Sequence, residues 1–87
     1  MAEQHLMKAT AIKIAEIYIP AALRQPIDPK KLEEIAVSIA DIGQQTPILV
    51  RPDKERYVLV SGLHRLEACR ALGETTVIAN IVQARKH

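Results

Sequence analysis

One stretch of the chain places apolar residues at the three- and four-residue spacing of an amphipathic helix. It runs from Pro29 to Ile42, and one face gathers its apolar side chains: Leu32, Ile35, Ala36, Ile39 and Ile42. Asp28 is a favourable N-cap, and a proline follows it at the first helical position. Gly43 supplies a stop. The pattern therefore predicts a helix with both ends specified locally.

A second, shorter helix is predicted from about Leu63 to Leu72. Its inward face consists of Leu66, Cys69 and Leu72, and Gly73 caps its end. Ser61 precedes this helix, and a serine at that point is a common N-cap.

Short apolar or alternating runs predict four strands. The alternation of Ile12, Ile14 and Ile17 with polar residues predicts a strand over Ala11–Ile17. Three further runs read as strands: Pro47–Arg51, Arg56–Val60 and Thr76–Val82. The turn between the second and third strands predicts a hairpin. The order of elements favours a mixed α/β (α+β) fold, with a small mixed sheet and two main helices.

Composition limits the size of the domain and the kind of core that it can form. The chain has 87 residues, of which 48% are apolar, with no Trp or Phe, so one small domain with an aliphatic core is expected. We expect a flexible lead-in at 1–10, the domain at 11–83 and a basic tail at 84–87. No apolar run is long enough to span a membrane, which favours a cytoplasmic protein.

The residues able to bind a metal are sparse. The single cysteine, Cys69, excludes an intramolecular disulfide and is expected to be a small core residue. The histidines, His5, His64 and His87, are scattered and lack nearby carboxylates. No metal site is predicted.

The turn Ser61-Gly62-Leu63-His64-Arg65 is the most informative segment. A glycine between a strand and a helix lets a ligand approach the backbone, and basic residues in a first helical turn suit an anion or phosphate. The structural alternative is that Arg65 pairs with Glu67 or Glu55. His64 either donates to phosphate or moves a proton, or it is a half-exposed helix residue; Ser61 either caps the helix or contacts the ligand.

The span from about Ile12 to Val82 resembles the ParB/sulfiredoxin-like superfamily, in particular the ParB N-terminal (ParB-like nuclease) domain. The matching residues lie in the predicted strands and helices and just before the first helix: a strand end near Ile17, Arg24, Leu32–Ile39, Gly43, Pro47–Arg51, Tyr57–Gly62, Arg65, Ala68, Leu72-Gly73 and Ile78–Val82. This run of motifs is fairly specific for the fold and much less specific for activity.

The resemblance implies a nucleotide pocket in a DNA-partition or regulatory domain. The family's Gly-x-x-Arg turn maps onto Gly62 and Arg65, and its arginine before the first helix maps onto Arg24. The nucleotide- or phosphate-binding residues expected are Arg24, Ser61, Gly62, His64 and Arg65. The expected ligand is a nucleoside triphosphate, with Mg²⁺ as an accompanying ion. The alternatives are a phosphotransferase or nuclease on the same fold, and a ligand-free scaffold that acts by self-association.

Departures from the family pattern bear on enzyme activity. In sulfiredoxins the turn reads Gly-Cys-His-Arg, and the cysteine does the chemistry; here Leu63 stands at the cysteine position. Sulfiredoxin activity is therefore not expected. ParB turns usually carry an acidic residue and two arginines after the glycine, and Leu63 and His64 replace the first two of these.

DNA binding by this chain alone is expected to be weak. The sequence ends at His87, soon after the last strand, without the helix-turn-helix region that follows in ParB proteins, and its net charge is only +2. Sequence-specific DNA contact would then come from a partner protein or from a self-assembled form of this chain. Because so small a domain is only marginally stable alone, a homo-oligomer is also a natural expectation.

Overall fold

The computed structural model describes residues 9–44 and 46–82 of the 87-residue chain. The predicted tail at 84–87 and most of the predicted lead-in at 1–10 lie outside these residues, so the predicted domain boundaries stay a prediction.

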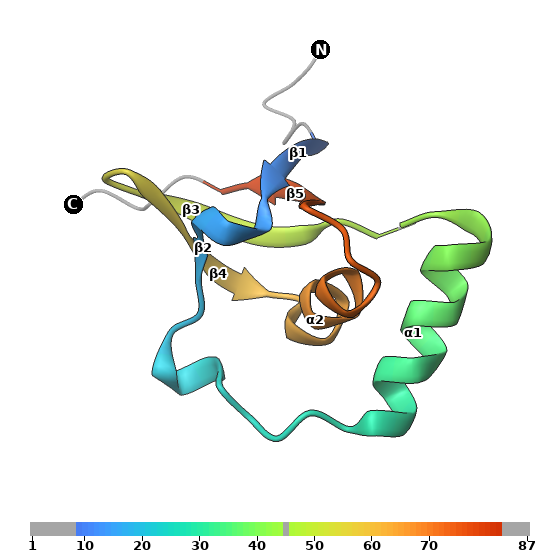
Figure 1. The fold of residues 1–87 in the computed structure, drawn as a ribbon. Helices are drawn as coiled ribbons and strands as arrows, with labels where there is room; N and C mark the ends of the chain where they lie inside the picture. The colour runs from blue at the N-terminus through green and yellow to red at the C-terminus, as the bar shows by residue number, and fades with distance from the viewer. Residues whose placement is uncertain (1–8, 45, 83–87) are drawn as a thin grey trace, which may run out of the picture.

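A single mixed sheet of five strands forms the centre of the fold (Figure 1). The strands are β1 (Ala9–Lys13), β2 (Ile17–Tyr18), β3 (Ile48–Asp53), β4 (Arg56–Ser61) and β5 (Thr76–Ile81), and their order across the sheet is β1-β5-β3-β4-β2. The β1/β5 and β3/β4 pairs are antiparallel, whereas β3/β5 and β2/β4 are parallel. The predicted α+β class, mixed sheet and hairpin are confirmed.

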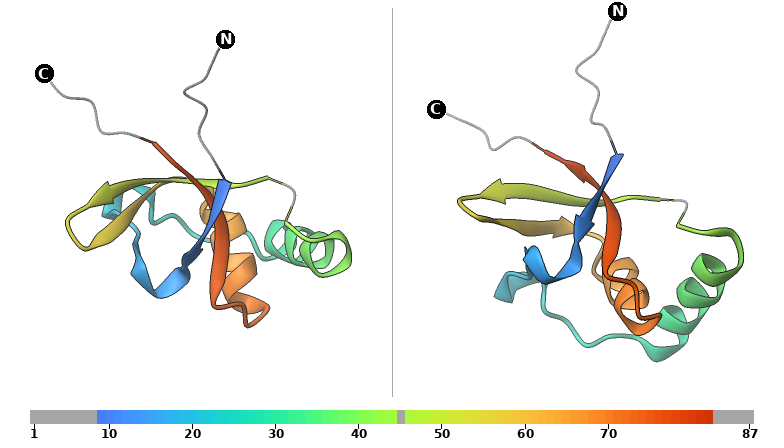
Figure 2. Two further views of the ribbon diagram at one scale, coloured as in Figure 1. Left: turned by 90° about the horizontal axis from the view of Figure 1, so that it is seen from above. Right: turned by 45° about the horizontal axis from the view of Figure 1, so that its top comes forward.

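Two helices accompany the sheet. Helix α1 (Pro29–Ile42) has the predicted bounds, and the Asp28 carboxylate caps it by accepting from the backbone N–H groups of Lys30 and Lys31. Helix α2 (Leu63–Ala71) follows β4 directly and packs against the sheet. Helix α1 packs against α2 at the side of the molecule rather than over the sheet (Figures 1 and 2). No helix in the described ranges is long and apolar enough to cross a membrane.

The predicted strand over Ala11–Ile17 is wrong as one element. The chain forms β1, then the 3₁₀ turn η1 (Ile14–Glu16), then β2, and these two strands lie on opposite edges of the sheet. The apolar spacing explains the break, because Ile12 and Ile14 are two residues apart while Ile17 follows after three. A continuous strand would turn Ile17 away from the core, whereas the η1 turn returns it to the interior.

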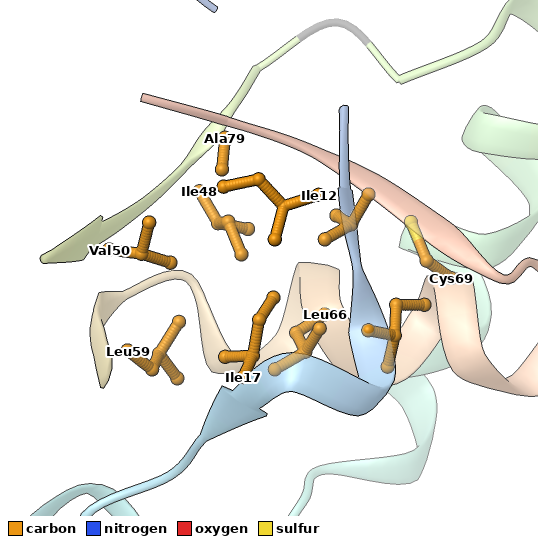
Figure 3. Close-up of a cluster of buried hydrophobic side chains, with 10 residues drawn as sticks. Ile12, Ile17, Ile48, Val50, Leu59, Leu66, Cys69 and Ala79 are labelled. Atoms are coloured by element: carbon orange, nitrogen blue, oxygen red, sulfur yellow. The ribbon is translucent and has the colours of Figure 1, made fainter. Parts of the chain in front are cut away.

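The core lies between the sheet and α2 (Figure 3). It contains one cysteine and otherwise aliphatic side chains, which come from all five strands, from η1 and from α2: Ile12, Ile14, Ile17, Ile48, Val50, Leu59, Leu66, Cys69, Val77 and Ala79. Leu66 and Cys69 point inward as predicted. Leu72 does not; it is 38% exposed, because α2 ends before it.

The helix ends show why the local patterns succeed. Gly73 has φ of 81°, and the bonds from Gly73 N to Arg70 O and from Glu74 N to Cys69 O close α2 in a Schellman arrangement.

Helix α1 has a weaker apolar face than expected: Ile42 is 59% exposed, and no residue of α1 is fully buried.

Candidate functional site

The turn between β4 and α2 requires glycine at position 62. Gly62 has φ of 106°, a left-handed conformation that side chains disfavour. A Cβ atom built there would lie 2.7 Å from Ile48 Cγ2 and 2.9 Å from Ile48 Cβ. Since Ile48 is 1% exposed in the core, it cannot retreat easily. The fold therefore demands this glycine whether or not a ligand approaches it.

Helix α2 begins without a side-chain cap. Its N-cap residue is Gly62, and the prediction that Ser61 caps the helix is wrong. The first intrahelical bond runs from Leu66 N to Gly62 O at 2.9 Å, so the three preceding N–H groups of the helix have no partner within it. The first turn also holds no acidic residue. The positive end of the helix is thus left without a compensating side-chain charge of its own.

A pocket of about 250 Å³ opens in front of this helix end. The residues that line it come from the segment before α1, from β4 and from α2: Leu23, Gln25, Val60, Ser61, Gly62, Leu63 and His64. Three of the five predicted site residues, Ser61, Gly62 and His64, are therefore together. Leu23 and Gln25 were missed, because nothing local in the sequence indicates that a segment 36 or more residues earlier lies beside the turn.

His64 connects the two helix starts. Its Nε2 atom accepts a hydrogen bond of 3.4 Å from the backbone N–H of Asp28, the residue that caps α1. His64 is half-buried and is the second residue of α2. His64 is therefore a partly exposed helix residue, as one of the two alternatives has it, and it also lines the pocket at the turn.

Arg24 lies next to the pocket but does not line it. Its Nε donates to the carbonyl oxygen of Ile19 at 2.9 Å, and its guanidinium carbon lies 5.7 Å from the ring centroid of Tyr18. Arg24 instead borders an adjacent pocket of about 370 Å³, which shares Gln25 and Leu63 with the first. The two pockets are therefore neighbours along α2.

Arg65 is half-buried at the third position of α2 and does not line the pocket at the turn. Within the described residues Glu67 makes its ion pair with Arg70, at 3.6 Å, and not with Arg65. The structural alternative of an Arg65–Glu67 pair is thus not seen there.

The polar loop after α1 and the cysteine lie elsewhere. Gln44 and Cys69 line a separate cavity of about 250 Å³ beside β5. Cys69 is 2% exposed, and burial, followed by the negative charge of Glu74, raises the pKa of its thiol above the ordinary value of 9.0. The prediction of a core cysteine is confirmed. In the described part of the chain no three His, Cys, Asp or Glu side chains gather as a metal site; His5 and His87 lie outside it.

Comparisons with known proteins relate this chain to ParB proteins. Residues 2–87 match the model of the ParB N-terminal domain. A probable chromosome-partitioning protein ParB of Campylobacter jejuni is 35% identical over 75 residues, which are 85% of this chain and 27% of the relative. This chain thus spans about a quarter of that relative.

Two solved structures are similar to the whole fold. Sulfiredoxin from Arabidopsis thaliana matches with a TM-score of 0.82 and 31% identity, over 88% of this chain and 86% of that one. A C-terminally truncated ParB from Caulobacter crescentus, complexed with CTP-gamma-S, matches with a TM-score of 0.77 and 26% identity, over 91% of this chain and 46% of that one.

Proposed function

Because this chain belongs to the ParB N-terminal domain family, we propose that it is a nucleotide-binding module that holds the phosphates of a nucleoside triphosphate at the start of α2. CTP is the first candidate, since the similar Caulobacter ParB was solved with a CTP analogue. The module would serve a DNA-partition or regulatory role through partners.

The uncapped start of α2 is the observation that carries this proposal. Backbone N–H groups at a helix start bind phosphate oxygens, and the helix dipole adds to the attraction. Here no side chain caps the helix, no acid stands in its first turn, and a pocket lies directly in front. A phosphate group would complete the hydrogen bonding that the side chains leave unmade.

Size and charge agree with a phosphate chain rather than a whole nucleotide in this pocket. Its volume of about 250 Å³ is below the roughly 300–1,000 Å³ typical of ligand sites, and the adjacent pocket of about 370 Å³ adds room. Arg24 lines the adjacent pocket and Arg65 follows the lining residue His64 in α2, and the proposal assigns these two arginines as the cations that approach the phosphates.

Mg²⁺ fits this site only as a companion of the phosphates. Within the described residues no acidic side chain lines the pocket at the turn, so such an ion would be held there by phosphate oxygens and water, where it neutralises phosphate charge. The adjacent pocket has one carboxylate in its lining, that of Glu67, which pairs with Arg70. One carboxylate that is already paired with an arginine gives little support to the phosphotransferase and nuclease alternatives, because such chemistry needs acidic residues to hold Mg²⁺.

Thermal unfolding with each of CTP, ATP, GTP and UTP, with and without Mg²⁺, tests the proposal. A ligand at about one hundred times its dissociation constant stabilises the fold by about 2.7 kcal/mol. We expect one nucleotide to raise the unfolding temperature and Arg65→Ala to abolish that rise while leaving the ligand-free protein folded.

Lys54→Gln is the matched control, because it also removes one positive charge but lies in the β3–β4 turn, at the other end of β4 from Gly62. If all four nucleotides leave the unfolding temperature unchanged, the proposal fails. An equal rise in unfolding temperature in the wild type and in Arg65→Ala would show that the ligand binds away from Arg65.

A further inference from the structure

We propose that His64 is a positioning residue whose tautomer is set by the cap of α1, so that a neutral imidazole bridges Asp28 and the bound phosphate. The inference rests on the proposed function and deepens it: the same side chain would accept from α1 with one nitrogen and donate to the ligand with the other. Occupancy of the pocket is then coupled to the start of α1.

The hydrogen bond to Asp28 determines which ring nitrogen carries the proton. A backbone N–H can only donate, so Nε2 of His64 must be the unprotonated acceptor in the 3.4 Å contact with Asp28 N. In a neutral imidazole the proton then resides on Nδ1. A backbone N–H does not lose its proton as a titrating side chain does, so the preference for the Nδ1-protonated tautomer persists as long as α1 stays in place.

The remaining nitrogen, Nδ1, is the one closer to the backbone of His64, which is the second residue of α2. In any histidine, Nδ1 is bonded to the ring carbon next to Cβ, whereas Nε2 is at the far side of the ring. His64 lines the pocket at the turn while its far nitrogen reaches Asp28. The proposal assigns the Nδ1–H group of this pocket-lining side chain as the donor to a phosphate oxygen at the uncapped helix start.

Asp28 extends the coupling into α1. Its carboxylate accepts from the backbone of Lys30 and Lys31, and its own N–H donates to His64, so one residue ties the first turn of α1 to the side chain at the pocket. The chain between η2 (Ala21–Leu23) and α1 runs beside α2 (Figure 1). The lining residue Gln25 belongs to this chain, and the lining residue Leu23 ends η2. A ligand that fixes the ring would therefore also order this segment.

Two substitutions of His64 separate its two bonds. The amide nitrogen of an asparagine occupies nearly the position of Nδ1, and the amide group of a glutamine reaches nearly the position of Nε2. We expect His64→Asn to keep the nucleotide-induced thermal shift but to speed hydrogen exchange at the Asp28 amide. His64→Gln should preserve slow exchange at Asp28 but weaken CTP and inorganic triphosphate binding about tenfold.

Nitrogen-15 NMR of the ligand-free full chain reads the tautomer directly. We expect Nδ1 protonated and Nε2 unprotonated at neutral pH, with Nδ1 shifting when inorganic triphosphate is added. Protonated Nε2, whether as the other tautomer or as imidazolium, overturns the inference. The inference is also overturned if the wild type binds CTP or inorganic triphosphate and His64→Gln binds the same ligand equally well. A wild type that binds neither CTP nor inorganic triphosphate instead defeats the proposed function, and the ligand half of the bridge with it.

Discussion

The side-chain amide of Gln44 takes the place of a missing strand residue opposite Ile78. Its Oε1 accepts from Ile78 N and its Nε2 donates to Ile78 O, both at 2.8 Å, and Nε2 also donates to Thr46 O at 2.9 Å. The pairing of β3 with β5 starts only at Ile48 and Ala79, and the preceding Pro47 has no N–H to offer. Gln44 thus completes the backbone hydrogen bonding of β5 and joins the end of α1 to the sheet.

Substitution of Gln44 should therefore cost stability. Gln44→Ala leaves the N–H and C=O groups of Ile78 without their partners, and we expect a loss of about 1–3 kcal/mol in the free energy of unfolding. Gln44→Glu keeps an acceptor for Ile78 N but turns a carboxylate toward Ile78 O. Urea unfolding should show at least as large a loss at pH 7, relieved as the pH falls toward about 4, where the new carboxyl group regains a proton to donate. A pH-independent loss would contradict this account.

Gly62→Ala should destabilise the protein more than Gly73→Ala. Both residues have positive φ, 106° and 81°, so alanine adds a conformational cost of about 1–2 kcal/mol at either position. Only at position 62 does the new Cβ meet Ile48, which adds about 1–3 kcal/mol of overpacking, whereas a Cβ at Gly73 would have no atom of the other described residues within 4 Å, its two chain neighbours aside. Equal losses in chemical denaturation would show that the contact with Ile48 relaxes at no cost.

Cys69 should make stability depend on pH in the alkaline range. Its pKa is raised in the folded state by burial and then by Glu74, so above about pH 9.0 the unfolded chain loses its proton first. The stability present below pH 9.0 is therefore lost as the pH rises from that value through the folded pKa. Cys69→Ala should cost about 1 kcal/mol at pH 7 and lose less stability than the wild type as the pH rises above 9.0.

Thiol labelling gives an independent check on Cys69. Because its side chain is buried and its pKa is raised, reaction with a thiol reagent at pH 7 should be slow in the folded protein and fast in urea. Nucleotide binding should be unchanged in Cys69→Ala, since Cys69 lines a different cavity from the turn at Gly62. Rapid labelling of the native protein would contradict the core assignment.

DNA binding by the 87-residue chain should be weak and independent of sequence. Its net charge of +2 supports few phosphate contacts, so we expect dissociation constants in the range of about 10⁻⁴–10⁻⁶ M at physiological salt, weakening further as salt is added. Competition binding measures this with a labelled duplex against excess random DNA. Submicromolar binding to one sequence that survives the competitor would overturn the prediction.

The sequence alone determined the elements whose signals are local. Asp28, Pro29 and Gly43 mark both ends of α1, and the observed bounds agree with them. The β3–β4 hairpin and the start of α2 at Leu63 follow in the same way from apolar runs and a single glycine. Hydrogen bonds and steric limits within a few residues decide these features, so no distant contact is needed to predict them.

Tertiary structure decided the features that depend on distant contacts. The segment read as one strand became β1 and β2 on opposite edges because its isoleucines must all enter one core. The same packing brought Leu23 and Gln25 to the turn at Gly62 and left Arg24 and Arg65 outside the pocket lining. It also joined His64 to Asp28. Which side chains meet across a fold depends on the order and direction of its strands, and the helical or strand periodicity of the sequence does not indicate that order.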